Sequence, residues 1–370
     1  MHPVLCILGT RPEAIKVLPV VRALRCASIP TRVLFTAQHT HLAEEVFDLF
    51  GILPDLRLPA RGEGTLTNTL TAMLPPIDHA LAALTPCAVV VQGDTLSAFA
   101  GGLCAFFRHI PLYHMEAGLR TGVYDEPYPE EMLRRALTAM ASVHFATTEQ
   151  ARAHLLREGV APSSVACVGN TVLDALHAIL PSCHTHPSDG RYRLLLTLHR
   201  RETDTSLRRR LLVSIRRLLD AHPAFDLFFP MHPTAKEVAQ DVLGHTARAH
   251  LCKPMGPRAF YEQLLCADLV LTDSGGVQEE AAYLGVRTLV LRDVTEREAE
   301  LSRGELTLTG RSPARVFTIA NACIRAIEQA PPVDAEARRL SALTGTHGAA
   351  QAIAERIAQD VKEKERMDAP

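Results

Sequence analysis

Two acidic residues in the first half of the sequence follow segments that have the pattern of buried strands, and a third begins a helical pattern shortly after them. Asp94 comes after the apolar run 88–91, Glu116 follows the run 110–115, and Glu130 opens a helical pattern. Because the carboxyl ends of parallel strands meet at one edge of a sheet, we expect these carboxylates to converge. Converging carboxylates can remove and return protons as general bases and acids. Each one alone could instead cap a helix or complement a helix dipole.

The first strand-like segment runs into a turn that could hold an anion. The sequence G-T-R-P-E-A-I-K, residues 9–16, combines a tight turn, a proline suited to the first helical position, and two cations, Arg11 and Lys16. The N–H groups and the dipole of a helix N-terminus attract negative charge. The alternative is an ordinary turn with two solvated cations. The turn lacks the G-x-G-x-x-G pattern, so it gives no support to an NAD-type dinucleotide fold.

The second half contains a stronger anion-binding pattern. In L-T-D-S-G-G-V-Q-E-E-A, residues 271–281, a strand-like run ends in a polar turn with two glycines, and a helix follows. Backbone N–H groups at this turn suit a diphosphate, and Glu280 could accept a hydrogen bond from a ribose hydroxyl. The alternative is that the glycines only tighten the connection. His199 and His232 stand where other strand-like runs end and could donate to a phosphate, although each could be a structural histidine.

Strand-like and helix-like segments alternate along the chain, which is typical of parallel α/β sheets. The expected strands are 4–8, 31–36, 88–91, 110–115, 143–146, 165–168, 194–198, 227–229, 269–271 and 288–291. At 370 residues the chain exceeds what one hydrophobic core usually supports, and residues 181–192 have the composition of a linker. We therefore expect two doubly wound α/β domains facing a cleft, 1–171 and 172–347, with the amphipathic helix 348–368 packed on the first.

The composition argues against several functions. The formal net charge of −2 leaves no surplus of Lys and Arg to neutralise phosphates, so we expect no nucleic-acid partner. No apolar run approaches membrane-spanning length and no basic leader precedes the first strand, which predicts a cytoplasmic protein without a membrane partner. The nine cysteines include no C-x-x-C pair and predict reduced thiols rather than disulfides or metal ligands.

Taken together, these segments resemble the bacterial non-hydrolysing UDP-N-acetylglucosamine 2-epimerase family in order, spacing and most letters, from Gly9 to about Arg297. The resemblance implies two Rossmann-like domains in a glycosyltransferase-B-like fold, with UDP held mainly by the second domain and the sugar between the two. It also implies a homodimer that needs no cofactor and no metal. The catalytic positions are then Asp94, Glu116, Glu130 and His199. The substrate-binding positions are Arg11, Lys16, His232, Phe260, Ser274, Gly275, Glu280 and Arg297, to which we add Gly276 of the same turn.

Such an enzyme inverts C2 of a UDP-activated 2-acetamido sugar. A proton on C2 is too weakly acidic for a carboxylate to remove unless the C1–O bond breaks early, so UDP must leave and later add again. The expected reaction interconverts UDP-N-acetylglucosamine and UDP-N-acetylmannosamine, or a close relative, for surface polysaccharide precursors.

Six positions depart from the family pattern, namely Leu133, Leu137, Leu198, Thr203, Met255 and Glu298. We expect these residues to change the polar packing around the sugar pocket. Three alternatives stay open: a hydrolysing 2-epimerase, a glycosyltransferase of the same fold, and a catalytically impaired UDP-sugar-binding protein. Incubation without an acceptor separates an epimerase from a glycosyltransferase, because only an epimerase then releases a C2-inverted product.

Overall fold

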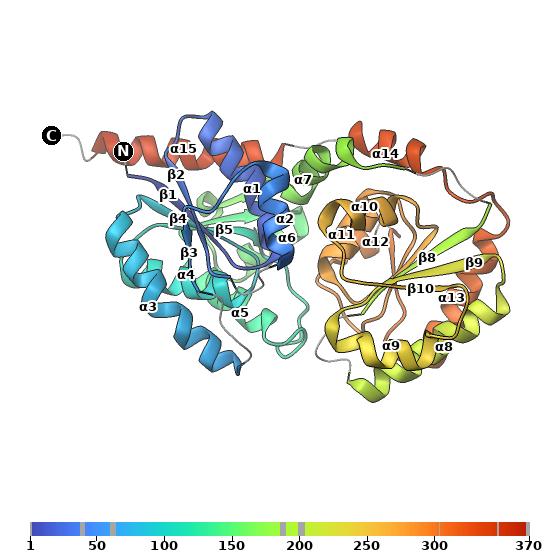
Figure 1. The fold of residues 1–370 in the computed structure, drawn as a ribbon. Helices are drawn as coiled ribbons and strands as arrows, with labels where there is room; N and C mark the ends of the chain where they lie inside the picture. Colours follow the sequence, from blue (N-terminus) through green and yellow to red (C-terminus); the bar gives the residue numbers. More distant parts are fainter. Residues whose placement is uncertain are drawn as a thin grey trace. The chain divides into compact units, whose positions relative to one another are not determined.

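The computed structural model describes residues 2–37, 41–59, 64–185, 190–198, 204–302, 304–345 and 348–367. The chain divides into two compact units. The first unit consists of residues 1–178 together with 346–370, and the second consists of residues 179–345. Each unit is a twisted parallel sheet flanked by helices (Figure 1).

The first unit is built on a seven-stranded sheet. Its strands are β1 (Val4–Leu8), β2 (Thr31–Phe35), β3 (Leu56–Arg57), β4 (Ala88–Gln92), β5 (Leu112–Ala117), β6 (Val143–Ala146) and β7 (Val165–Cys167). They are all parallel, in the order β3-β2-β1-β4-β5-β6-β7. The order reverses between β1 and β4. Open α/β sheets bind ligands beyond the carboxyl ends of such a strand pair.

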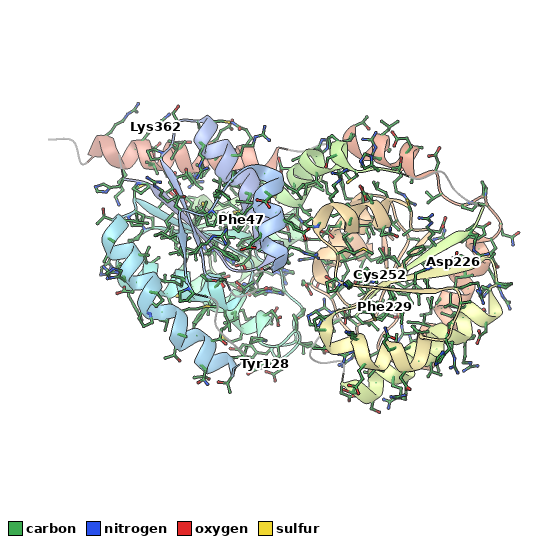
Figure 2. All side chains as sticks on the ribbon, viewed as in Figure 1. Phe47, Tyr128, Asp226, Phe229, Cys252 and Lys362 are labelled. Atoms are coloured by element: carbon green, nitrogen blue, oxygen red, sulfur yellow. The ribbon has the colours of Figure 1, made fainter. Side chains whose placement is uncertain are left out.

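Helices cover both faces of this sheet. They are α1 (Arg11–Cys26), α2 (His41–Phe50), α3 (Leu66–Leu84), α4 (Leu96–Phe107), α5 (Glu130–Met140), α6 (Glu149–Arg157), α7 (Thr171–Ile179) and α15 (Ala349–Met367). One apolar core joins the sheet to α1, α2 and α15, and a second joins it to α3, α4 and α5. Phe47 of α2, labelled in Figure 2, belongs to the first core. Its ring meets the ring of Phe35 edge-on.

The last helix of the chain packs on the first unit. Figure 1 shows α15 beside α1, and Ile353 and Ile357 are buried in the core that α1 also lines. The carboxylate of Asp174 in α7 accepts hydrogen bonds from the backbone N–H groups of Gly348, at 2.9 Å, and Ala350, at 3.2 Å. A carboxylate at this place satisfies N–H groups that a helix start leaves unpaired. Asp174 therefore anchors the returning chain on α7.

Helix α7 belongs to the first unit. Its residues Val172 and Ala175 are buried in the same core as α1 and α15. The first unit therefore extends to residue 178, whereas the sequence pattern predicts a boundary after residue 171. The difference arises because one apolar face of a helix does not reveal which of two cores it joins.

The second unit repeats the architecture with six strands. These are β8 (Tyr192–Thr197), β9 (Phe225–Pro230), β10 (Ala249–Cys252), β11 (Leu269–Thr272), β12 (Thr288–Val290) and β13 (Leu306–Leu308), in the order β10-β9-β8-β11-β12-β13. The helices are α8 (Thr205–Ala221), α9 (Lys236–Leu243), α10 (Pro257–Leu265), α11 (Gly275–Tyr283), α12 (Glu298–Ser302), α13 (Pro313–Ile327) and α14 (Ala335–Leu343). One core packs α8, α9 and α13 against the sheet and includes Phe229 (Figure 2). The strand order reverses between β8 and β11, so the glycine turn after β11 lies at this unit's ligand-binding edge.

Candidate functional site

Asp94 lies in the turn between β4 and α4, where Arg134 of α5 holds its carboxylate. Nε of Arg134 donates to Asp94 Oδ2 at 3.0 Å, and Nη2 donates to the same oxygen. Nη1 of Arg134 donates to Glu131 Oε2 at 3.0 Å. The side chain of Arg134 is 5% exposed and that of Asp94 is 26% exposed. The arginine thus fixes a carboxylate that solvent can still reach.

Glu116 lies in β5 on the next strand of the sheet. Its backbone has a φ of 60°, which is rare for a residue with a side chain, and the register between β5 and β6 shifts at this point. Such irregularities re-aim a side chain and recur beside functional sites. Nζ of Lys16 donates to Glu116 Oε2 at 2.8 Å, and Nε2 of Gln92 donates to the same oxygen. The side chains of Lys16 and Glu116 are both nearly buried.

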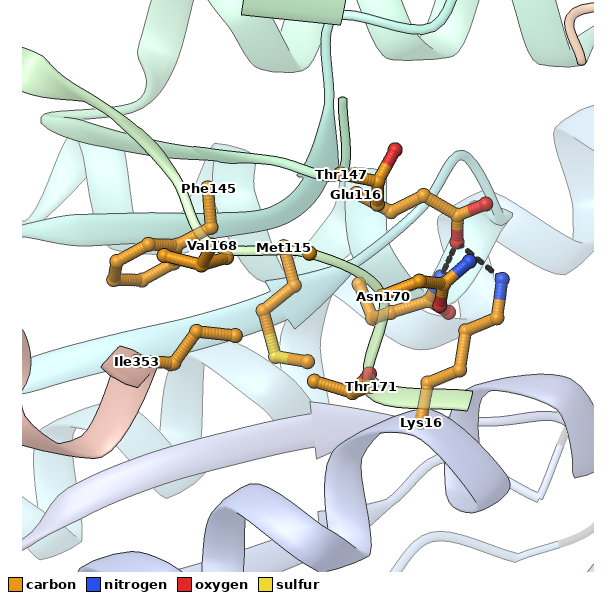
Figure 3. A pocket seen from close by; sticks show the side chains of 11 residues that line it. Lys16, Met115, Glu116, Phe145, Thr147, Val168, Asn170, Thr171 and Ile353 are labelled. Atoms are coloured by element: carbon orange, nitrogen blue, oxygen red, sulfur yellow. Dashed lines mark hydrogen bonds and ion pairs between the residues drawn. The ribbon is translucent and has the colours of Figure 1, made fainter. Parts of the chain in front are cut away.

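A small pocket borders the Lys16–Glu116 pair (Figure 3). Apolar side chains, including Phe145, Val168 and Ile353, line one part of it, and polar groups, including Asn170, line the part around the ion pair. An ion pair at such a boundary is poorly hydrated, so its electrostatic interaction is stronger than on an open surface. The pocket is built entirely from the first unit.

Glu130 and Glu131 at the start of α5 have different surroundings. Glu130 is half-buried. Glu131 is fully buried and accepts hydrogen bonds from Arg134, from Arg135 at 3.0 Å and from the N–H of Thr121 at 3.3 Å. Glu131 therefore organises the arginines and the preceding loop. The sequence signal for this role is an acid followed by arginines three and four positions later, a spacing that places them on one helix face.

A second buried acid, Glu13, lies in the first turn of α1, and no sequence pattern predicted a role for it. Arg11 begins α1 and is half-buried, while Glu13 is fully buried. Oε2 of Glu13 accepts a hydrogen bond from the N–H of Gly9 at 3.0 Å, and Oε1 accepts one from the hydroxyl of Thr95 at 2.7 Å. Burial raises the pKa of Glu13 to about 7, because the loss of hydration outweighs the hydrogen bonds that lower it.

In the second unit, the anion-binding turn predicted within residues 271–281 lies at the N-terminus of α11. Ser274 caps α11, and its Oγ accepts a hydrogen bond from the N–H of Val277 at 3.5 Å. A Cβ added at Gly275 would lie 2.7 Å from Glu296 Oε1, whereas a Cβ added at Gly276 would meet no atom within 4 Å. Gly275 therefore packs tightly against the protein, and Gly276 leaves open space at the helix start.

Charged side chains surround this helix start. Nε of Arg297 lies 3.0 Å from Glu279 Oε1, and the hydroxyl of Tyr261 donates to Glu280 Oε1 at 2.9 Å. Phe260, itself buried, contacts the ring of Tyr261 edge-on. The structure thus gathers Ser274, Gly275, Gly276, Glu280, Arg297 and Phe260 around α11 and α10.

The two predicted histidines differ in what the structure shows. His232 is exposed at the end of β9, and its Nδ1 lies 2.9 Å from the hydroxyl of Thr234. His199 lies outside the described residues, as does Thr203.

The leucines that depart from the family pattern lie in apolar cores. Leu133 and Leu137 are buried against α4 and the sheet of the first unit. Leu198 is buried in the core of the second unit. These three side chains contribute to hydrophobic packing.

Three further observations concern cofactors, membranes and thiols. Within the described ranges, no group of three or more His, Cys, Asp or Glu side chains could hold a metal ion. None of the helices in those ranges combines the length and apolarity needed to cross a membrane. All nine cysteines are described, and none of them forms a disulfide.

Two Rossmann-like units, one with carboxylates at its strand ends and one with a glycine turn before a helix, define a glycosyltransferase-B-like α/β protein. The family model for UDP-N-acetylglucosamine 2-epimerase matches residues 22–360. The Bacillus subtilis UDP-N-acetylglucosamine 2-epimerase is 38% identical over 325 residues, which cover 86% of each chain. The chain belongs to the UDP-N-acetylglucosamine 2-epimerase family.

Solved structures agree with this assignment. The S. aureus MnaA–UDP co-structure has a TM-score of 0.89 at 33% identity and covers 98% of this chain and 97% of that chain. The Neisseria meningitidis UDP-GlcNAc 2-epimerase bound to UDP-GlcNAc has a TM-score of 0.89 at 32% identity and covers 96% of this chain and all of that one (100%). The expected fold class and family are therefore confirmed.

Proposed function

We propose that this chain interconverts UDP-N-acetylglucosamine and UDP-N-acetylmannosamine by inverting C2 through elimination and re-addition of UDP. The observation that carries the proposal is a pair of carboxylates at the carboxyl ends of neighbouring strands, each bound by a nearly buried cation. Asp94 lies in the turn after β4 and is bound by Arg134, and Glu116 lies in the last part of β5 and is bound by Lys16. Family membership supports the choice of substrate, because the matched relatives are named for this reaction.

The proposed reaction begins with departure of UDP. The C1–O bond breaks, its electron pair leaves with the β-phosphate oxygen, and a base takes the proton from C2, which gives 2-acetamidoglucal and UDP. UDP then adds back to C1 while an acid delivers a proton to the opposite face of C2. Asp94, Glu116, Glu130 and His199 are the groups we propose for these transfers. Several acids are needed because C2 has two faces to serve.

The proposed UDP site is the start of α11. The open side of Gly276, the N–H groups of the helix start and the nearby Arg297 suit a diphosphate. Glu280 is proposed to accept a hydrogen bond from a ribose hydroxyl, and Phe260 and His232 are proposed to contact the same ligand. Arg11 and Lys16 of the first unit are proposed to bind the substrate as well.

The test is incubation of the purified chain with UDP-N-acetylglucosamine in D2O, without acceptor, followed by NMR. The expected product is UDP-N-acetylmannosamine with deuterium at C2. Oxygen-18 placed between C1 and phosphorus should scramble into non-bridging positions, because free UDP allows the phosphate to rotate. Free N-acetylmannosamine would identify a hydrolysing enzyme. Tight binding of the substrate with no conversion would contradict the proposal and favour a binding protein or a transferase.

We propose that the enzyme is a cytoplasmic homodimer that feeds surface polysaccharide synthesis. Nine cysteines without a disulfide suit a reducing compartment. Exposed apolar side chains on the first unit, among them Leu53, Phe106 and Phe107, provide surface that a second copy could cover. Light scattering at working concentration should give twice the 40.4 kDa chain mass. A monomer mass would contradict the dimer alone.

A further inference from the structure

The two turns at the reversal point of the first sheet are joined by one buried carboxylate. The first turn follows β1 and carries Arg11. The second follows β4 and carries Asp94. Glu13 reaches both, since its two oxygens accept from the N–H of Gly9 and from the hydroxyl of Thr95. The bond to Thr95 joins residues 82 positions apart in the chain.

The hydroxyl of Thr95 makes two hydrogen bonds. It donates its proton to Glu13 Oε1 at 2.7 Å, and its oxygen accepts a hydrogen bond from the N–H of Ala98 at 3.0 Å, which caps α4. A continuous series of hydrogen bonds therefore runs from Gly9 through Glu13 and Thr95 to the start of α4. Asp94 precedes Thr95 directly, so the direction of its side chain depends on the geometry of this series.

Packing leaves these turns little freedom. A Cβ at Gly9 would collide with the hydroxyls of Ser97 and Thr36, which contact each other at 2.7 Å. On the other side, Nε2 of His114 lies 2.7 Å from the carbonyl oxygen of Gly93. A carbonyl only accepts, so this nitrogen carries the proton. The residues around Asp94 are thus held from β1 and from β5.

A purely structural role for Glu13 would be that of a capping box. In this motif a Thr at the N-cap and a Glu three positions later satisfy the N–H groups of one helix start. Thr10 and Glu13 have this spacing, and Thr10 Oγ1 accepts from the N–H of Glu13 at 3.5 Å. The motif does not account for the hydrogen bond to Thr95, which belongs to the other turn.

We propose that Glu13 is a positioning residue for the epimerisation: by accepting from Thr95 it fixes the turn that carries Asp94 relative to the turn that carries Arg11. This inference rests on the proposed function. Small displacements of a reacting group have large kinetic effects, since a shift of about 1 Å can cost roughly 100-fold in rate. The loss of the Glu13–Thr95 bond should therefore lower turnover more than it lowers substrate binding.

The experiment is a double-mutant cycle in the full chain. Glu13→Gln keeps the size of the side chain and an acceptor for Gly9, but it presents an NH2 group where Thr95 donates. Thr95→Val removes the hydroxyl, and Thr95→Ser retains it. The control is Asp268→Asn, which alters a half-buried carboxylate before β11 in the second unit that accepts hydrogen bonds from the N–H groups of Arg193 and Val333.

We expect Glu13→Gln and Thr95→Val each to lower kcat by about 10-fold or more with KM changed by less than about 3-fold. The double variant should be no slower than the worse single variant, because both changes remove one interaction. Thr95→Ser, which retains the hydroxyl, should keep kcat within about 3-fold of the native value. Asp268→Asn should lower the thermal midpoint and leave kcat unchanged. Circular dichroism and the thermal midpoint of every variant establish that it is folded.

Two results would overturn the positioning role. One is a folded Glu13→Gln protein with native kcat. The other is additive losses in the double variant. Neither result contradicts the proposed function, which fails separately if the native protein yields no C2-inverted product.

Discussion

A nearly buried cation accompanies each of the two carboxylates at the strand ends. Removing Lys16 and Arg134 from water costs free energy, and ion pairs in such places often add little to stability. Both cations donate directly to Asp94 or Glu116, and Gln92 adds a donor to Glu116. We infer that these contacts serve to orient the carboxylates.

The first prediction concerns the carboxylates. Asp94→Asn, Glu116→Gln and Glu130→Gln should each lower turnover by about 100-fold or more, because amides cannot carry the C2 proton. UDP affinity, measured by calorimetry, should stay within about 3-fold of native, because the proposed UDP site lies on α11. Glu149→Gln, at a carboxylate that is 76% exposed, is the control and should leave both quantities unchanged. Native turnover in all three variants would refute the site.

A second prediction concerns acid stability. His114 and His144 are buried register partners on β5 and β6, and burial lowers the pKa of both to about 4. Between pH 6.5 and 4 the unfolded chain therefore binds protons that the folded chain does not, so the free energy of unfolding falls as pH falls. By pH 4.5, each histidine lowers the free energy of unfolding by on the order of 2 kcal/mol. Glu13, with a pKa raised to about 7, acts in the opposite sense between pH 4.5 and 7.

Urea unfolding at several pH values tests this balance. When the effects of these three groups are summed, the unsubstituted chain should bind about one proton more in its unfolded state than in its folded state between pH 4.5 and 6.5. His144→Gln should remove about one proton from the pH slope. An unchanged slope in His144→Gln would show that His144 does not titrate in this way.

Site residues that have a local sequence signal could be predicted. Residues whose partners lie far away along the chain could not. Asp94 and Glu116 could be found because each follows an apolar run. Arg134 contacts Asp94 from 40 positions away, and Glu13 contacts Thr95 from 82 positions away. No local pattern encodes such pairs, because they exist only once the sheet brings the strand ends together.

Strands of the sheet interiors were predicted well, and three at the edges were not. The expected runs 4–8 and 143–146 coincide with β1 and β6. The unpredicted strands are β3, β10 and β13, each at the end of a strand order and less buried than the central strands. An edge strand meets fewer neighbours, so its residues need not be uniformly apolar, and the signal is weaker.

The third prediction separates the two glycines at the start of α11. Gly276→Ala should fold normally, because its Cβ meets no atom within 4 Å, but it should weaken UDP binding by about 10-fold or more if the diphosphate occupies that space. Gly275→Ala should lower the thermal midpoint, because its Cβ would lie 2.7 Å from Glu296 Oε1. Calorimetry with UDP and thermal unfolding provide the two measurements. Native UDP affinity in Gly276→Ala would show that the diphosphate does not occupy the space beside Gly276.

At the scale of the whole molecule, the two units have separate cores and separate ligand-binding edges. The carboxylates belong to the first unit and the glycine turn to the second. Binding and proton transfer are therefore expected to respond to different substitutions.

A fourth prediction follows for UDP alone. Saturating UDP should slow amide hydrogen exchange at residues 274–280, since a ligand stabilises the region that it binds. The turns at residues 9–11 and 93–95 should change less with UDP than with UDP-N-acetylglucosamine, whose sugar we expect beside Asp94. Mass spectrometry of peptides from both units measures this directly. Equal protection of both sets of turns by UDP would contradict a UDP site confined to the second unit.

The return of α15 to the first unit affects the order of folding during synthesis. Nascent domains generally fold from the N-terminus onward. Here the side chains of Ile353 and Ile357 complete the core of the first unit, and they leave the ribosome only after residues 179–345. The second unit can therefore fold while the first unit still exposes the apolar surface that α15 later covers. The polypeptide that is translated first is the one whose tertiary structure is finished last.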